Sequence, residues 1–285
     1  MSSISASLTT SPFAQFRRHA TFYLWYDTFY AVVALCGAMT VIQTGWRGLL
    51  PEFELWHLAL FPAALYVMIM AHVFAHNASH GSFPKPINRL MGELSGALVL
   101  TKFASWEIVH RRHHRYSDDA EKDPHPAERS YWRYAFNTLV NVELQLRQEY
   151  YDTHGDTPET RRYERWRSRL SFVSGVLMSL FFFLLLGKSG FFLLYLPAFV
   201  GAALFVIHFN WVGHNAHRPD YPIAPADLDY GWFWVGNRIF FGIYFHGTHH
   251  KLAMLFNPMK APKHLRAKQA VPQSVSEEEE VHAAA

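Results

Sequence analysis

The 285-residue sequence contains one cysteine, Cys36, which lies inside an apolar segment. A single cysteine cannot form an intramolecular disulfide, and it excludes metal and redox motifs that need several cysteines. Any metal ion must therefore be held by histidine, aspartate, glutamate, asparagine or glutamine.

Charged residues are also scarce, at 17% of the chain, against about 25% in ordinary soluble proteins. The net charge is +3 at pH 7, and the basic residues are dispersed along the chain. A nucleic-acid-binding protein usually concentrates them in a patch or stripe, so we expect no nucleic-acid partner. Half of the residues are hydrophobic, and they are concentrated in long runs.

Four apolar runs predict transmembrane helices, at residues 22–44, 55–75, 170–186 and 191–212. A helix of about 20 residues crosses a hydrocarbon core of about 30 Å. Short connections, GWRGLLPEFE and GKSG, join the runs in pairs, so they predict two helical hairpins, with a kink at Pro197 in the fourth run. A shorter apolar stretch, 89–103, predicts a helix that dips into the membrane surface.

Basic residues predict the orientation, because they are enriched on the cytoplasmic side of membranes. They gather on one side of the predicted hairpins, in Arg17, Arg18, 111–169 and 251–268, whereas the other side carries Arg47 and Lys188. Both termini and the histidine-rich segments are therefore expected in the cytoplasm. We predict an all-α, multi-pass integral membrane protein, of the kind found in a bacterial inner membrane, with a cytoplasmic cap.

This topology divides the chain into three parts. Residues 1–21 form a cytoplasmic N-terminal segment, which we take to precede an uncleaved membrane anchor. Residues 22–255 form the membrane domain. Residues 256–285, which contain the acidic stretch EEEE, form a cytoplasmic tail that we expect to be disordered.

Histidines are clustered at the predicted cytoplasmic ends of the helices. The spacings H-x3-H, H-x2-H-H and H-x2-H-H occur at His76 and His80; His110, His113 and His114; and His246, His249 and His250. A fourth pair, His214 and His217, follows the last apolar run. Residues three or four apart share one face of a helix, so each cluster can direct its imidazoles at one point.

These ten histidines predict two metal ions. Imidazole nitrogen suits iron, copper, nickel and zinc, whereas calcium and magnesium prefer oxygen. Ten ligands are too many for one ion and sufficient for two. A zinc-protease interpretation of HNASH fails because Asn77 stands where that motif needs a glutamate general base.

Acidic residues near the clusters have open roles. Glu54 and His57 have a spacing found in soluble di-iron bundles, but they lie at the far end of the second run from His76, so we take Glu54 as a surface residue. Glu107 has the same spacing to His110 and could orient it. Three acidic residues follow the second cluster and could either orient imidazoles or stabilise a loop: Asp118, Asp119 and Asp123.

The motifs HNASH, HRRHH and HGTHH, at His76, His110 and His246, resemble the three histidine boxes of integral-membrane fatty acid desaturases. That superfamily also includes carotenoid ketolases and hydroxylases and alkane hydroxylases. The resemblance covers about residues 60–255. It implies two iron ions, O2 as co-substrate, a fatty-acyl or other long apolar substrate, and an electron donor of the ferredoxin, rubredoxin or cytochrome b5 type.

Flanking residues favour the desaturase branch. HGSF follows the first box, and HRPDY resembles the additional histidine region of acyl-CoA desaturases, so that either His214 or His217 would match that ligand. The sequence KLAMLFNP after the third box departs from the family pattern, so the resemblance does not identify the acceptor pocket. We therefore expect an oxygen-dependent fatty-acyl desaturase.

Two alternatives remain. A ketolase or hydroxylase would insert oxygen into a carotenoid or alkyl chain. A metal transporter would place polar residues at mid-bilayer, whereas the middles of the four runs carry no charge. About two irons per chain would favour the enzyme over the transporter.

Overall fold

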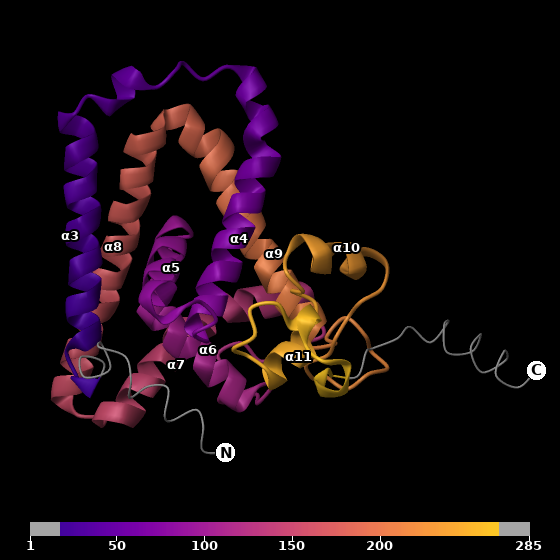
Figure 1. Ribbon diagram of the computed structural model, residues 1–285. Coiled ribbons are helices and arrows are strands. Elements are labelled where there is room, and N and C mark those ends of the chain that lie inside the picture. The colour runs from indigo at the N-terminus through magenta and orange to yellow at the C-terminus, as the bar shows by residue number, and fades with distance from the viewer. Residues whose placement is uncertain (1–17, 268–285) are drawn as a thin grey trace, which may run out of the picture. The chain divides into compact units, whose positions relative to one another are not determined.

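The structure is a computed structural model that describes residues 18–267. Within this range the regular secondary structure is helical (Figure 1), and one isolated antiparallel β-bridge pairs Asp227 with Phe245. The all-α prediction is confirmed. Most of the predicted N-terminal segment 1–21, and the part of the predicted tail after residue 267, lie outside the described residues.

The chain forms two compact units, one from residues up to 61 and 146–196, and the other from 62–145 and 197 onward. The helices and turns of the first unit are α3 (Phe22–Gln43), η1 (Trp46–Leu49), η2 (Leu55–Leu60), α8 (Pro158–Gly190) and the π-helical turn η3 (Phe191–Tyr195). Those of the second are α4 (Phe61–Ser79), α5 (Lys85–Leu98), α6 (Phe103–Tyr116), α9 (Leu196–Gly213), α10 (Gly231–Ile239), α11 (His246–Lys251), η4 (Pro258–Lys260) and η5 (Lys263–Leu265). Helix α7 (Tyr131–His154) contributes to both.

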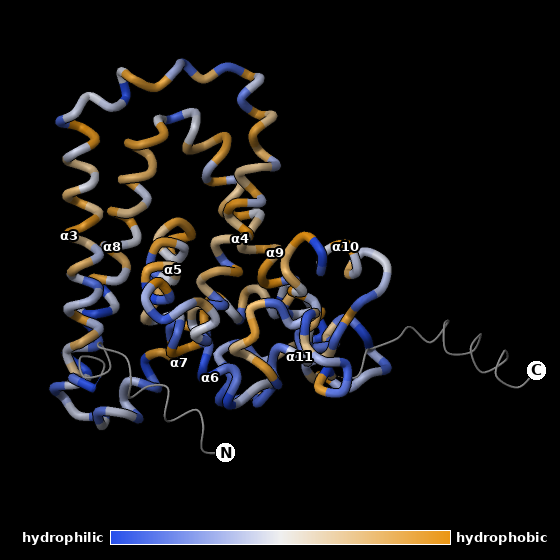
Figure 2. The backbone as a smooth tube through the Cα atoms, viewed as in Figure 1, coloured by the Kyte–Doolittle hydropathy of each residue, from blue (hydrophilic) through white to orange (hydrophobic). Residues whose placement is uncertain are grey.

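In the first unit, α3 packs along α8 (Figure 1). The buried positions of α3, among them Tyr23, Tyr30, Ala34 and Ala38, recur every three or four residues and form one face. The rest of α3 exposes large apolar side chains such as Phe29. A helix that is apolar on its exposed side is suited to lipid rather than to water. Figure 2 shows hydrophobic colouring along much of α3 and along the part of α8 away from its start.

Helix α8 begins twelve residues before the predicted start at residue 170. Thr157 caps it: its hydroxyl accepts from the Thr160 N–H at 3.2 Å, and Pro158 occupies the first turn, where its missing N–H costs nothing. Near the other end, Gly187 has φ 71° and interrupts the helix. The sequence predicts a kink at Pro197, the second residue of α9. The irregular backbone lies before that residue, at Gly187 and in the π-helical turn η3.

Three stretches are long and apolar enough to cross a membrane: Phe22–Gln43, Leu55–Ser79 and Pro158–Gly213. The third contains both the third and the fourth predicted runs, with Gly187 between them. The structure thus gives three candidate membrane-spanning stretches by length and composition. The division of the third into two separate passes stays a prediction.

The second unit contains the histidine-bearing helices. Its hydrophobic core includes Phe209, Val212, Ala226, Leu228 and Tyr244. Backbone hydrogen bonds join Ala226 N–H to the Gly213 carbonyl at 2.8 Å and Leu228 N–H to the Tyr244 carbonyl at 2.9 Å. These contacts hold the segment before α11 against the end of α9.

Two expectations for this unit differ from the structure. The predicted helix at 89–103 is divided, because α5 ends at Leu98 and α6 begins at Phe103 after a turn in which Leu100 has φ 53°. The folded part also continues past the predicted tail boundary at 256. The Asn77 amide donates to the Phe256 carbonyl at 3.2 Å, and the Ala267 N–H donates to the Thr248 hydroxyl at 3.0 Å.

Candidate metal centre

Nine of the ten predicted histidines converge in the second unit, from the ends of α4, α6 and α9 and from α11. They form two groups whose ligand nitrogens lie within 4.8 Å of one another: His76, His80, His110, His114 and His249; and His113, His214, His246 and His250. Each of the two H-x2-H-H clusters contributes to both groups. His217 belongs to neither group.

The first group has the nitrogen separations expected of ligands that share an ion. The Nε2 atoms of His80 and His110 are 2.8 Å apart, and those of His114 and His249 are 3.1 Å apart. Two nitrogens bound at right angles, at the roughly 2.1 Å typical of a zinc–imidazole bond, would be about 3.0 Å apart. The observed spacing therefore fits a common ion of similar size.

The second group has the same spacing. His246 Nε2 lies 2.9 Å from His214 Nε2 and 3.1 Å from His250 Nε2. The two groups adjoin, because the rings of His114 and His250 stack with centroids 4.2 Å apart. This arrangement could hold two ions close together.

A glycine makes the approach of α11 to α9 possible. A Cβ atom added to Gly213 would lie 2.8 Å from Cγ of His246, closer than nonbonded carbons approach. Glycine at this position therefore lets His246 reach the end of α9, where His214 lies.

Two carboxylates orient the histidines of the second group. His113 Nδ1 lies 2.9 Å from Asp123 Oδ1, and His214 Nδ1 lies 2.9 Å from Asp118 Oδ2. When an ionised carboxylate accepts a hydrogen bond from Nδ1–H, the Nε2 atom of the same ring carries the lone pair. The two acids thus direct Nε2 of each ring toward the group.

Asp123 is itself held in place. The backbone N–H groups of Asp118 and His125 donate to its oxygens at 2.7 and 2.9 Å. Burial raises the pKa of Asp123 to about 7, and these two hydrogen bonds act in the opposite direction. Asp119 has the other role left open by the sequence, because it accepts from the backbone of Glu121 and Lys122 and so stabilises the loop.

Several imidazole nitrogens fit a metal ion. His113 Nε2 and His76 Nε2 are buried and have no hydrogen-bond partner among residues 18–267, which is costly unless something binds them. Burial lowers the pKa of seven of these histidines, all outside the membrane-spanning stretches, and the neighbouring imidazoles lower it further. They are His80, His110, His113, His114, His246, His249 and His250. These rings are neutral near pH 7, so protons do not compete for their lone pairs.

The sequence did not identify His125. It lies with His113 and Asp123 in a third possible ligand group, and its ring is 4.1 Å from that of His113, centroid to centroid. Its Nδ1 is 3.3 Å from the Tyr134 hydroxyl. His125 follows His114 by eleven residues in a loop, so no helical spacing identified it; the sequence DPH beside Asp123 was the available signal.

Glu107 and His217 differ from their expected roles, whereas Glu54 does not. Glu107 accepts from Arg111 at 2.8 Å, whereas Nδ1 of His110 is buried with no hydrogen-bond partner among the described residues. Glu54 is exposed, as predicted, and its backbone N–H donates to His57 Nδ1 at 2.9 Å. The ring of His217 lies beside Trp211 and Phe233 instead of facing the other histidines.

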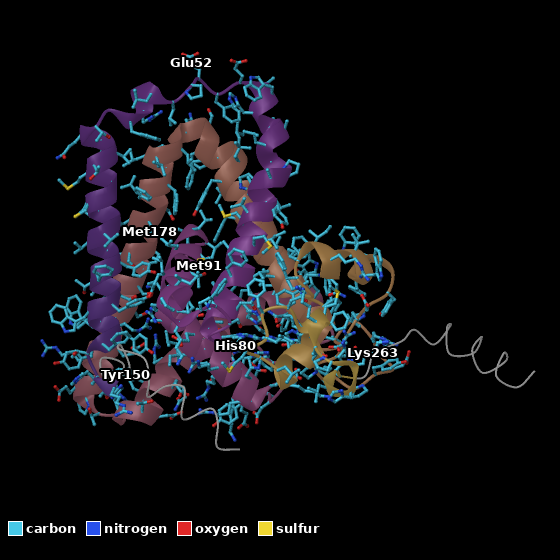
Figure 3. All side chains as sticks on the ribbon, in the orientation of Figure 1. Glu52, His80, Met91, Tyr150, Met178 and Lys263 are labelled. Atoms are coloured by element: carbon cyan, nitrogen blue, oxygen red, sulfur yellow. The ribbon has the colours of Figure 1, made fainter. Side chains whose placement is uncertain are left out.

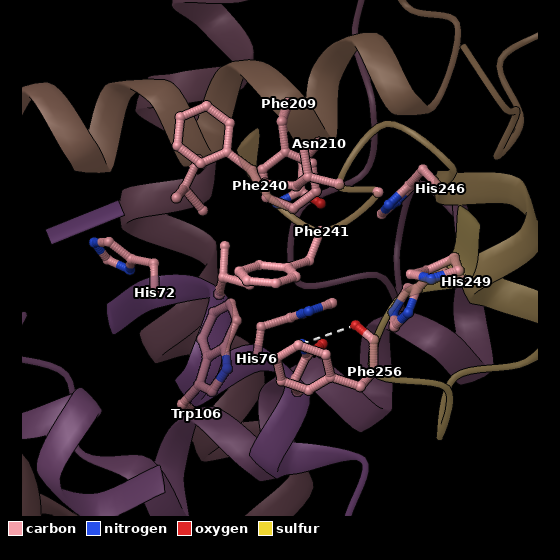
Figure 4. Close-up of a pocket in the computed structure, with 16 residues that line it drawn as sticks. His72, His76, Trp106, Phe209, Asn210, Phe240, Phe241, His246, His249 and Phe256 are labelled. Carbon is pink, nitrogen blue, oxygen red and sulfur yellow. Dashed lines mark hydrogen bonds between the residues drawn. The ribbon is translucent and has the colours of Figure 1, made fainter. Parts of the chain in front are cut away.

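An apolar pocket borders the histidine groups. Figure 4 shows His76, His246 and His249 on its wall with five aromatic residues: Trp106, Phe209, Phe240, Phe241 and Phe256. Val73, Val206 and Ile243 add aliphatic surface, and His72 and Asn210 add polar atoms. The pocket has a volume of about 40 Å³ and places apolar side chains directly beside the histidine groups.

The chain is similar in sequence to fatty acid desaturases. The model of the fatty acid desaturase family matches residues 51–256. The chain is 36% identical over 85 residues to a delta(12) fatty acid desaturase of Caenorhabditis elegans, a match that covers 29% of this chain and 20% of that protein. It is 33% identical over 93 residues to a chloroplastic omega-3 fatty acid desaturase of Glycine max, covering 31% of this chain and 20% of that protein.

A third relative is an sn-1 oleoyl-lipid 12-desaturase of a Picosynechococcus strain, 36% identical over 53 residues, or 18% of this chain and 15% of that protein. The chain thus spans about a fifth or less of the length of the curated relatives that it matches. No solved structure matches it significantly.

Proposed function

Because this chain belongs to the fatty acid desaturase family, we propose that it is a membrane oxidoreductase that introduces a C=C bond into a fatty-acyl chain. The observation that carries this proposal is the contact between the two histidine groups and the apolar pocket. His76 and His249 of one group and His246 of the other line that pocket. The pocket thus marks where an apolar substrate would lie beside both groups, and it would have to widen beyond its volume of about 40 Å³ to admit a long acyl chain.

The nine histidines are proposed as ligands of two iron ions, one in each group. An all-nitrogen ligand set is compatible with iron, and the family resemblance favours iron over copper, nickel or zinc. Bound iron would supply the oxidising chemistry, with O2 as oxidant. The overall reaction balances when two hydrogen atoms from the acyl chain, with two electrons and two protons from a donor, reduce one O2 to two water molecules.

The protein's own side chains would position the reactants. Asp118 and Asp123 hold the rings of His214 and His113 in one orientation and one tautomer. The aromatic wall of the pocket would exclude water and restrict the acyl chain to a few positions. The hydrogen bond from Asn77 to the Phe256 carbonyl would keep the pocket wall attached to the end of α4.

The proposed topology has four membrane passes in two hairpins, at residues 22–44, 55–75, 170–186 and 191–212, within a membrane domain at 22–255. Gly187 and η3 would form the turn between the last two passes. The histidine-bearing cap and both termini would face the cytoplasm, as at a bacterial inner membrane. The excess of arginine and lysine on that side supports this orientation.

An electron donor of the ferredoxin, rubredoxin or cytochrome b5 type would reach the cap from the cytoplasm. Of the basic residues near the histidines, Arg111 and Arg112 make internal contacts with Ser79 and Gln145. Arg115 and Lys251 are exposed. These two are the proposed basic contacts for an acidic donor.

The test is mass spectrometry of lipids and pigments from a bacterial host that expresses the chain with a ferredoxin and a carotenoid pathway. His113→Ala serves as the inactive variant, and His217→Ala as the matched histidine control. Acyl chains lighter by two hydrogens in the wild type and in His217→Ala, but not in His113→Ala, would support the desaturase.

Other outcomes would contradict it. Oxygenated carotenoids or alkyl products with unchanged acyl chains would indicate the ketolase or hydroxylase alternative. Purified protein with zinc or no metal, and without altered lipids or pigments, would favour a transporter or structural role.

A further inference from the structure

A row of arginines lies on one face of α8, in the first unit. Arg161, Arg165 and Arg169 recur every four residues and therefore lie on the same side of the helix. They line a pocket of about 480 Å³ together with Arg147, Tyr151, Glu164 and Ser168. The pocket thus combines four guanidinium groups with two hydroxyl groups.

Its charge is not cancelled by the one acid in its lining. Glu164 is buried, and Arg167, which does not line the pocket, donates to both of its oxygens at 2.7 to 3.0 Å. Of the pocket's own arginines, Arg147 has Nε 3.7 Å from Glu164 Oε1. Arg161 is paired with Asp156 at 2.8 Å. Arg165 and Arg169 are exposed and form no ion pair within residues 18–267. Like charges four residues apart on a helix repel each other, so a bound anion would relieve this repulsion.

The pocket lies where α8 changes from charged to apolar. Between Leu170 and Leu186 its exposed residues are apolar: Phe172 is 75% exposed and Val176 51%. Trp166 is half exposed, and the Arg169 guanidinium lies 5.3 Å from its ring centroid. Tryptophan and arginine are typical of the headgroup level of a membrane. Figure 3 labels Tyr150, the neighbour of Tyr151, at this charged end of the unit and Glu52 at the other end.

We propose that this pocket binds the phosphate of an anionic phospholipid headgroup. The planar guanidinium groups of Arg165 and Arg169 match the oxygens of a phosphate. Tyr151 and Ser168 can donate further hydrogen bonds, and the exposed apolar surface beyond Leu170 would contact the acyl chains of the same lipid. Basic pockets at the cytoplasmic ends of membrane helices suit such headgroups. The proposal is independent of the reaction at the histidine groups.

The test is native mass spectrometry of the purified full-length protein in detergent, titrated with phosphatidylglycerol. Separate titrations with phosphatidylcholine and with inorganic phosphate distinguish an anionic lipid from a zwitterionic one and from free phosphate. The double variant Arg165→Gln/Arg169→Gln should bind phosphatidylglycerol roughly 30-fold more weakly. Arg162→Gln, which removes an exposed arginine of the same helix outside the pocket, should bind it as the wild type does.

Three outcomes would overturn the proposal: equal binding of both lipids by the wild type, unchanged phosphatidylglycerol binding by the double variant, or saturation by inorganic phosphate that phosphatidylglycerol does not displace. Arg165→Lys/Arg169→Lys provides a second measurement if the glutamine variant fails to fold. It keeps both charges, so it should retain preferential binding of phosphatidylglycerol over phosphatidylcholine. Loss of that preference in the folded lysine variant, with both charges still present, would also overturn the proposal.

Discussion

The imidazole of His214 lies 2.9 Å from the carboxylate of Asp118, although 96 residues separate the two in the sequence. This contact gives His214 a defined orientation toward His246, whereas His217, three residues later, is in neither histidine group. The sequence could not distinguish these two histidines, because both follow the fourth apolar run at a spacing that suits ligands.

We therefore expect His214→Ala to reduce bound iron from about two ions per chain to about one, and His217→Ala to leave it at about two. The reason is that one variant removes a ligand of the four-histidine group and the other does not. Iron would be measured by mass spectrometry of acid-digested, purified protein. Equal iron loss in both variants would contradict the assignment of His214.

Asp123→Asn should weaken metal binding by about 10- to 100-fold, the range typical of a partner that orients a ligand. The amide cannot accept from His113 Nδ1–H as strongly as a carboxylate does, so the ring loses its fixed tautomer. Iron retention during titration with a chelator measures the effect. Asp119→Asn is the matched control, because the side chain of Asp119 accepts hydrogen bonds from the backbone of Glu121 and Lys122 and does not contact a histidine in those bonds. An equal fall in iron retention in both variants would indicate a general effect on the loop.

Val206→Phe should narrow the apolar pocket and change the length of acyl chain that is desaturated. Val206 lines the pocket, and the added ring would occupy space that a long substrate needs. Gas chromatography of fatty acid methyl esters would report a shift toward shorter desaturated chains. Val200→Phe changes an exposed valine of the same helix outside the pocket and should leave the spectrum of products unchanged. An identical spectrum for Val206→Phe would argue against this pocket as the substrate site.

Arg167→Met should lower the free energy of unfolding by about 3 to 5 kcal/mol, as is typical when one member of a buried ion pair is removed. Arg167 is almost fully buried, donates to Glu164, and has Nη1 3.8 Å from Asp27 Oδ2. The substitution removes the buried guanidinium that lies against the carboxylates of Asp27 and Glu164, and the half-exposed Arg147, with Nε 3.7 Å from Glu164 Oε1, remains beside Glu164. Unfolding would be measured in detergent beside Arg162→Met, which changes an exposed residue and should have little effect. A similar small change in both would show that the buried pair is dispensable.

The sequence was most informative where local spacing carries the signal. Residues three or four apart share a helix face wherever the helix lies, so His76 and His80, or His246 and His250, could be grouped without a structure. The apolar runs likewise predict long helices from their composition alone.

Other features depend on contacts between distant segments and could not be predicted in this way. His125 reaches His113 through a loop, and Asp118 reaches His214 only after α6 and the end of α9 have packed together. The division of 89–103 into two helices depends on a turn at Leu100, a residue that gives no sequence signal for positive φ. The start of α8 is an exception, because Thr157 and Pro158 form a cap that can be recognised in the sequence.

The convergence of α4, α6, α9 and α11 also has a consequence for biosynthesis. His249 completes the group that begins with His76, and His246 and His250 complete the other. Neither group can therefore be assembled until the ribosome has passed residue 250. Insertion of the proposed metal ions would follow translation of all four helices, and chains truncated before His246 should capture less metal than the full-length chain.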